Sequence, residues 1–453
     1  MQLNITKLAP IIESARASFW FVPSIMILLT VLLTITTVYF DAVFIAEHQL
    51  SWPLIYGADV AAMRSLLGTI AAAMITVTSI AFSITIVALT LASSQFGPRL
   101  LRNFMKDRGT QIVLGSFISN FLFCILIFCA ISFEKPYYFK PGLSVATAIL
   151  MTFISVGILI YFIHHVAKAI QADVVIDQVY RELQDNIKSL FPSVKTESEV
   201  TTSSDVLATA KHQMNILANE DGYVQTLDIE QLVCLANEHE GRIKCFYSPG
   251  NFVVKGTVIA QVHTEKQPPS TLDEQILKQI SLGAYRTPVQ DPEFAIHQLV
   301  EIALRALSPG INDPYTAITC VDKLSAVLCD LTTKTFPQKV RFDEDGIIRV
   351  ISKELTFTNI AKAAFEQIRQ QANHNIAVTI RVLEALARLA CCVQNQQQTE
   401  FVLNQTDIIE QQQNKLSIAK DDLAEINARV ALIRQTVAEF SGDNNHKIDN
   451  SGH

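Results

Sequence analysis

Charged side chains are scarce in the first 165 residues of this chain. Only 15 occur there, 9 basic and 6 acidic, and the other 64 lie in residues 166–453. This division predicts a lipid-embedded first third followed by a soluble, acidic remainder. The overall formal charge of −7 argues against nucleic acid as a partner, because binding phosphates needs concentrated lysine and arginine.

Common catalytic and nucleotide-binding motifs are also missing. The sequence has no GxxxxGK[ST], GxGxxG, HExxH or GxSxG pattern. Its eight cysteines form no CxxC pair and no cysteine–histidine cluster with zinc spacing, so we expect reduced, buried thiols. No nucleophile can be paired with a base. We therefore expect a protein that is not an enzyme and that needs no metal or cofactor.

Four long apolar stretches are present where charge is scarce. They cover about residues 19–40, 66–95, 112–133 and 143–163, and each is long enough for a helix to cross the hydrocarbon core of a bilayer. Residues 1–165 are therefore predicted to form an α-helical transmembrane domain of four helices. The partner expected for this domain is the lipid bilayer.

The lysine and arginine distribution predicts the orientation of these helices. Lys7 and Arg16 lie in the N-terminal tail, and Arg99, Arg102 and Lys106 follow the second stretch. Short loops rich in lysine and arginine stay on the cytoplasmic side. We expect the N-terminus and everything after the fourth helix to be cytoplasmic.

The second apolar stretch carries an unusual polar stripe. Thr69, Thr76, Ser83 and Thr90 repeat every seven residues, so they share one helix face; we call these four the hydroxyl stripe. Ala72 and other small residues lie between them. One interpretation is close helix packing, and the other is the lining of a water-filled pore. No charged residue lies inside the stretches, which argues against a proton relay.

Basic residues follow this stretch directly. Gly97 and Pro98 end or kink the helix, and Arg99 and Arg102 come next. The arginines are interpreted either as an anchor in the headgroup zone or as a basic collar at the cytoplasmic mouth of a pore.

The remainder of the chain is predicted to be a cytoplasmic α+β domain. Its β-rich part contains PGNFVVKGTVIAQV, which is similar to half of a barrel-sandwich fold but lacks a carrier lysine, so it is interpreted as structural. The expected segments are a juxtamembrane helix at 166–191, a linker at 192–210, the β-rich module at 211–265, a helical region at 266–440 and a disordered tail at 441–453.

The most distinctive soluble stretch runs from Gly283 to Pro314. It contains RTPVQD and SPGINDP on either side of a predicted helix. One interpretation is a capped corner between two helices, with Asn312 or Asp313 as the N-cap and Pro314 in the first turn. The other is a ligand site, with a polar or phosphate-facing character, built from Arg286, Asp291, Arg305, Asn312 and Asp313.

These motifs carry a resemblance to a known family. Residues 75–111, GYVQTLD, the PG-x-FV module and RTPVQDPEFAIHQLVEIALRALSPGINDP resemble the bacterial membrane family called domain of unknown function 2254. The resemblance spans nearly the whole chain. It implies a bacterial inner-membrane protein with four helices and a cytoplasmic domain, and it implies no activity or site residue.

Two functional hypotheses follow. The first is a homo-oligomeric, channel-like protein that passes ions or small solutes through a pore lined by the second helix, with the cytoplasmic domain regulating it. The alternative is a membrane-anchored sensor or scaffold whose cytoplasmic domain binds a ligand or partner protein.

Overall fold

The computed structural model describes residues 20–44, 59–100, 104–105, 107–131, 141–191 and 211–449. The chain divides into two units, Met1–Val175 and Ile176–His453. We call them the N-terminal and the C-terminal unit and describe each by itself. The predicted linker at 192–210 lies outside the described residues.

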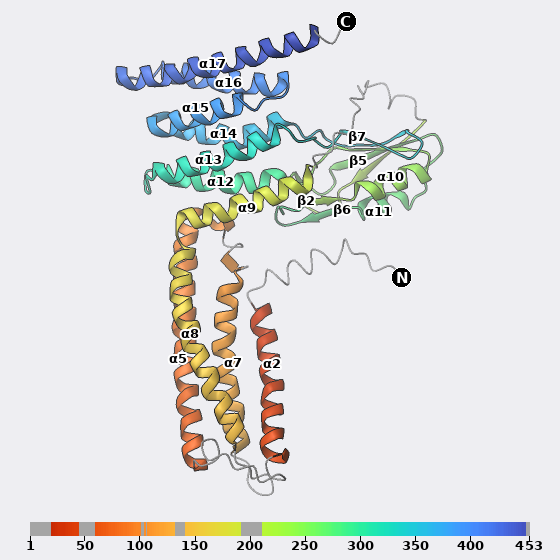
Figure 1. The fold of residues 1–453 in the computed structure, drawn as a ribbon. Coiled ribbons are helices and arrows are strands. Elements are labelled where there is room, and N and C mark those ends of the chain that lie inside the picture. The colour runs from red at the N-terminus through yellow and green to blue at the C-terminus, as the bar shows by residue number, and fades with distance from the viewer. Residues whose placement is uncertain are drawn as a thin grey trace. The chain divides into compact units, whose positions relative to one another are not determined.

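The N-terminal unit contains four helices that are long and apolar enough to cross a membrane. This confirms the predicted number, although the helices extend further than the apolar stretches and take in Arg64, Arg108 and Lys168 near their ends. They are visible in the lower part of Figure 1. The elements are α2 (Phe21–Tyr39), a π-helical turn η1 (Phe40–Phe44), α5 (Val60–Phe96), a 3-10 turn η2 (Pro98–Leu100), α7 (Arg108–Ile131) and α8 (Gly142–Ala169).

Helix α7 packs against the other three helices. Its residues Phe123, Cys124 and Ile127 are fully buried in a cluster with Met63 and Leu67 of α5. Gly115 lets α2 come close, because a Cβ there would lie 3.2 Å from the Cα of Pro23. Small residues at such crossings let helices approach within a membrane.

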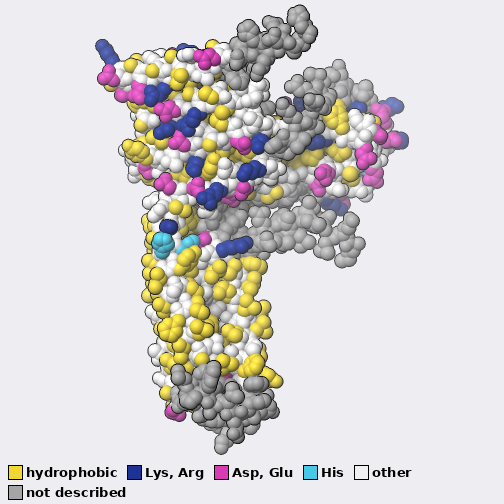
Figure 2. Space-filling model, viewed as in Figure 1, with side chains coloured by type: hydrophobic (Ala, Val, Ile, Leu, Met, Phe, Trp, Pro, Cys, Tyr) yellow, Lys and Arg dark blue, Asp and Glu magenta, His cyan; other side chains and the backbone are white. Residues whose placement is uncertain are grey.

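Large apolar side chains cover the outside of the N-terminal unit. Leu28, Phe153 and Ile160 are more than 60% exposed, and Figure 2 shows hydrophobic side chains over the length of the helices. An exposed apolar surface of this extent is stable in lipid and not in water. The unit therefore has the surface of a transmembrane domain.

The C-terminal unit mixes strands and helices. Helix α9 begins at Ala172, before the boundary between the units, and most of it belongs to the C-terminal unit. The juxtamembrane helix predicted at 166–191 is therefore divided, because α8 ends at Ala169. The elements are α9 (Ala172–Leu190), β1 (His212–Leu217), β2 (Gly222–Leu227), α10 (Ile229–Glu238), β3 (Arg242–Cys245), β4 (Phe252–Val253), β5 (Val258–Thr264), α11 (Leu272–Leu277), β6 (Ile280–Gly283), α12 (Pro292–Ala306), α13 (Pro314–Leu331), β7 (Val340–Phe342), β8 (Ile348–Ile351), α14 (Phe357–Gln371), a 3-10 turn η4 (Ala372–His374), α15 (Ile376–Ala390), α16 (Gln396–Gln413) and α17 (Lys420–Asp449).

The strands form two sheets, ordered β1-β5-β3-β8-β7 and β4-β2-β6. Neither sheet closes on itself among the described residues, so the predicted barrel-sandwich is not confirmed. The module also draws strands from beyond residue 265. In particular, β8 pairs with β3 in parallel, with Ile243 opposite Val350. Local sequence patterns cannot show a pairing between residues that lie so far apart in the chain.

Helices α12 to α17 lie beside one another as a layered stack in Figure 1. Helix α12 packs against α13 and α14, and α15 packs against α13 and α17. Buried Leu324, Leu328 and Leu386 are among the residues that fill the stack. Helix α17 continues to Asp449, whereas the sequence analysis predicts a disordered tail from residue 441.

Candidate functional site

The hydroxyl stripe lies on the outside of the N-terminal unit. Thr69, Thr76, Ser83 and Thr90 are all exposed in the single chain. The face of α5 that packs against α7 is different: it buries Thr78 and Thr85, together with apolar residues of the core. Packing within one chain therefore does not account for the stripe.

The positions between the stripe residues are exposed as well. Ser65, Ala72, Ser79 and Ile86 alternate with the stripe at spacings of three and four residues. This is the spacing at which two helices pack along a left-handed seam. We call the combined set, from Ser65 to Thr90, the α5 seam. All of it lies on the surface of the chain.

The threonines of the stripe donate their hydroxyl protons to the backbone of their own helix. Thr69 Oγ1 donates to the carbonyl of Ser65, Thr76 Oγ1 to that of Ala72 and Thr90 Oγ1 to that of Ile86, each at 2.9 Å. A hydroxyl that donates its hydrogen in a hydrogen bond still has lone pairs that can accept another one. The stripe thus presents acceptor oxygens outward along the helix.

The end of α5 has the geometry that the sequence indicates. Gly97 ends the helix with a φ of 111°, a conformation that favours glycine, and η2 follows. Arg99 is exposed. Arg102, the second residue of the predicted basic collar, lies outside the described residues.

An unpredicted hydrogen bond joins the start of α7 to the end of α8. His165 Nε2 donates to Asp107 Oδ2 at 2.6 Å. The same carboxylate accepts from the backbone and the hydroxyl of Thr110, at 3.0 and 2.6 Å. Burial raises the pKa of Asp107, but the hydrogen bonds from Thr110 and His165 outweigh it and hold this pKa below its usual value. The contact spans 58 residues, so no local pattern reveals it.

A second unpredicted carboxylate caps a membrane helix. Asp41, in η1, accepts from the backbone N–H groups of Leu143 and Ser144 at 3.0 and 2.9 Å and from the Ser144 hydroxyl at 2.6 Å. It is 3% exposed. A carboxylate satisfies the free N–H groups at a helix start and is stabilised by the helix dipole. Asp41 therefore fixes the start of α8 to the end of α2.

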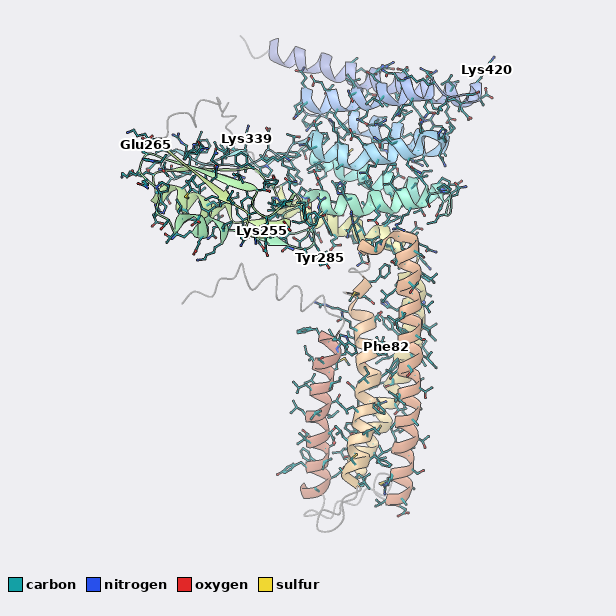
Figure 3. All side chains as sticks on the ribbon, turned by 180° about the vertical axis from the view of Figure 1, so that it is seen from behind. Phe82, Lys255, Glu265, Tyr285, Lys339 and Lys420 are labelled. Atoms are coloured by element: carbon teal, nitrogen blue, oxygen red, sulfur yellow. The ribbon has the colours of Figure 1, made fainter. Side chains whose placement is uncertain are left out.

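Two of the predicted ligand-site residues meet in the C-terminal unit. Arg286 donates from Nε and Nη2 to the Asp291 carboxylate at 2.7 and 2.9 Å, and its Nη1 lies 3.3 Å from His297 Nδ1. Asp291 is 2% exposed. Gly250 lies directly against the pair, with no room for a Cβ. Nearby, the carbonyl of Tyr285, which is labelled in Figure 3, accepts from Gln225 Nε2 at 2.9 Å.

The other three predicted residues lie at the far end of α12. Asp291 precedes this helix and Arg305 lies in its last turn, which places them roughly 20 Å apart at 1.5 Å per residue. Asp313 is the N-cap of α13 and accepts from Thr316 N at 3.2 Å. Asn312 adopts a left-handed φ of 50°. The five residues therefore do not form one site, and the capped corner is the correct interpretation of SPGINDP.

Among the described residues, no group of three or more histidine, cysteine or acidic side chains could hold a metal ion. All eight cysteines are free thiols. The prediction that they are buried is wrong for three of them, because Cys129, Cys234 and Cys391 are exposed.

Comparison with known proteins places the chain in a family. The family model described as "Predicted membrane protein (DUF2254)" matches residues 16–388. An uncharacterized protein of Mycobacterium bovis and one of Mycobacterium tuberculosis are each 32% identical over 333 residues, which is 72% of this chain. The match covers 63% of the length of these relatives. No solved structure matches the chain.

Proposed function

Because this chain belongs to the family of predicted membrane proteins called DUF2254, we propose that it acts in the membrane as an oligomeric channel. In this proposal α5 of each copy faces a common axis, and the hydroxyl stripe lines the pore. The membrane is the bacterial inner membrane, and the N-terminus and the C-terminal unit face the cytoplasm. The C-terminal unit regulates the passage of ions or small solutes.

The observation that carries the proposal is the exposure of the whole α5 seam. From Ser65 to Thr90, each position at the three-and-four spacing is exposed, although α5 packs against α7 and α8 through its other residues. Small side chains at this spacing favour the close approach of another helix. A lipid-facing helix has no need of this spacing, so we infer that copies of α5 meet along the seam.

The chemistry of the stripe suits a weakly selective pore. Its threonine hydroxyls donate hydrogen bonds to backbone carbonyls and keep lone pairs that can accept hydrogen bonds from other groups or coordinate an ion. Oxygen acceptors can replace part of the hydration shell of a cation in transit. The seam itself carries no charged side chain, so strong binding that would hold an ion in the pore is not expected.

The alternative of a ligand sensor receives less support. It rests on Arg286 and its neighbours, and this guanidinium is already bound by Asp291 and approached by Glu293 at 3.8 Å. An arginine held on two of its nitrogens by a buried carboxylate is typical of a structural ion pair. Arg305 and Asp313 lie at the other end of α12, so they cannot complete a site with it.

The experiment is ion and solute flux through the full chain reconstituted in liposomes. Thr76→Leu and Ser83→Leu place apolar bulk in the pore and are expected to reduce flux at least tenfold. Thr36→Leu is the matched control. Thr36 is also exposed and also donates to its own helix, at 2.8 Å to Leu32 O, but it lies on α2, and its substitution should leave flux unchanged.

Imaging of the full chain in lipid nanodiscs decides the same question independently. Cryo-electron microscopy is expected to show several copies with α5 nearest the axis. A monomer, or an oligomer in which the α5 seam faces lipid, would overturn the proposal. So would the absence of flux from vesicles that contain correctly folded protein.

A further inference from the structure

A cavity of about 260 Å³ lies between α2, α7 and α8 in the N-terminal unit. Its walls include Met26 and Leu33 from α2 and Ile158 from α8, and its floor includes Ser119 of α7. Two further lining residues, Leu29 and Ile154, are more than half exposed on the outside of the unit. The cavity is thus bounded by side chains that face the bilayer, and a molecule dissolved in lipid can enter it sideways.

Ser119 has a buried hydroxyl without a hydrogen-bond partner among the described residues. Its side chain is 3% exposed, and its Oγ makes no hydrogen bond. Two other hydroxyls of the cavity are satisfied: Thr30 Oγ1 donates to Met26 O and Ser155 Oγ to Met151 O, both at 2.8 Å. Ser155 Oγ also accepts from Asn120 at 3.1 Å. Burying a polar group without a partner is costly, and a ligand that accepted a hydrogen bond from Ser119, which lines the cavity, would offset this cost.

The depth of Ser119 in the membrane limits what this ligand can be. Ser119 lies halfway along α7, which spans Arg108–Ile131. The middle of a hydrocarbon core is about 15 Å from either interface. The ester carbonyls of phospholipids stay near the interface, and their chains contain no acceptor. A ligand that accepts from Ser119 must therefore carry its own acceptor atom to the bilayer centre.

The lining and the volume of the cavity further limit the ligands that it can bind. The lining residues include no acidic or basic side chain, so a charged group would be buried there without a counter-ion. The volume lies just below the roughly 300–1,000 Å³ typical of small-molecule sites.

We propose that this cavity binds an uncharged, lipid-soluble carbonyl compound of the quinone class, and that Ser119 Oγ donates a hydrogen bond to its carbonyl oxygen. The ring occupies the space between α2 and α8. The alkyl or prenyl tail leaves between Leu29 and Ile154 into the bilayer. Binding requires no redox step, and the proposal does not depend on the channel function.

The test is equilibrium binding of decylubiquinone to the full chain in lipid nanodiscs, corrected for nanodiscs without protein. Saturable binding at about one quinone per chain is expected. Ser119→Ala removes the donor and should weaken binding about fivefold, as expected for one hydrogen bond. Ser119→Leu fills the cavity and should abolish saturable binding. Thr36→Val, which alters an exposed hydroxyl of α2 outside the cavity, should leave binding unchanged.

A second probe tests whether binding depends on the carbonyl group or only on filling the cavity with apolar atoms. Dodecylbenzene has a ring and an alkyl chain but no carbonyl, and it is expected to bind more weakly than decylubiquinone and to be insensitive to Ser119→Ala. Equal binding of both probes, or a Ser119→Ala variant that binds decylubiquinone as tightly as the wild type, would overturn the proposal. So would a binding signal that does not saturate. The alanine variant and the second probe decide the matter even if Ser119→Leu does not fold.

Discussion

Nε2 of His165 lies 2.6 Å from Oδ2 of Asp107, and this contact joins α8 to the start of α7. The imidazole is stacked on the Tyr161 ring at 5.3 Å between centroids. Gly109 also lies against the imidazole, because a Cβ there would come within 2.7 Å of Nε2. The histidine is thus held in place by an aromatic ring, a glycine and a carboxylate.

Replacement of Asp107 by asparagine is expected to destabilise the protein by about 1–3 kcal/mol at neutral pH, because hydrogen bonds to a charged acceptor are lost. The pKa of Asp107 in the folded protein lies below its ordinary value of 3.8. Its contribution is therefore present above pH 3.8 and is lost as the pH falls through the lower, folded-state pKa. Thermal unfolding of the wild type and the Asp107→Asn variant in nanodiscs, from pH 3 to 8, measures this loss of stability.

The difference in unfolding temperature between the wild type and the Asp107→Asn variant should disappear in strong acid, as the pH falls below 3.8. Asp173→Asn, which alters an exposed carboxylate of α9, serves as the control and should change stability little. A difference that already disappears above pH 3.8 would contradict the assigned direction of the pKa shift.

Gly250 is predicted to be intolerant of any side chain. It has a φ of +90°, and a Cβ there would collide with the Asp291 carboxylate. Gly250→Ala therefore combines backbone strain with disruption of a buried ion pair, and should cost more than about 2 kcal/mol. Gly310→Ala is the matched control, because nothing lies within 4 Å of its Cβ position. Chemical unfolding of the two variants should separate them clearly, and equal stabilities would refute the argument.

Asp41 and Asp59 offer a matched pair of helix starts. Asp41 accepts three hydrogen bonds at the start of α8, whereas Asp59 is the N-cap of α5 without a side-chain hydrogen bond to it. Asp41→Ala should therefore destabilise the protein by about 1–3 kcal/mol, and Asp59→Ala by much less. Thermal unfolding in nanodiscs measures both. A larger loss for Asp59→Ala would show that the Asp41 cap is not formed in lipid.

Local chemistry was sufficient to predict a large part of this fold. The four membrane helices follow from runs of apolar residues whose length matches a bilayer. Asn312 or Asp313 was predicted as the N-cap of the helix that starts near Pro314, and Asp313 accepts a backbone N–H at the expected place. Each of these features depends on residues within a few positions of one another.

Several features that were missed depend on contacts between residues that are distant in the chain. Strand β8 pairs with β3, about a hundred residues earlier in the chain. The sequence around its four residues therefore did not indicate that they join this sheet. Asp41 reaches Ser144 over 103 positions. The five proposed ligand residues are close in sequence, but the length of α12 separates them into two groups. Sequence predicted the stripe on α5, and only the structure shows that it faces outward.

The exposed Arg99 gives the channel proposal a test of ion selectivity. If the end of α5 forms the cytoplasmic mouth of a pore, the arginine raises the local anion concentration and repels cations. Arg99→Glu should then shift the reversal potential measured across a salt gradient toward cation permeation. Low ionic strength should enlarge the shift, because salt screens exposed charges. The screening length is about 10 Å at 0.1 M salt and grows as the salt is diluted. Lys255→Glu makes the same charge change at an exposed site between β4 and β5 and should leave the reversal potential unchanged. Equal shifts in both variants would place Arg99 away from the permeation path.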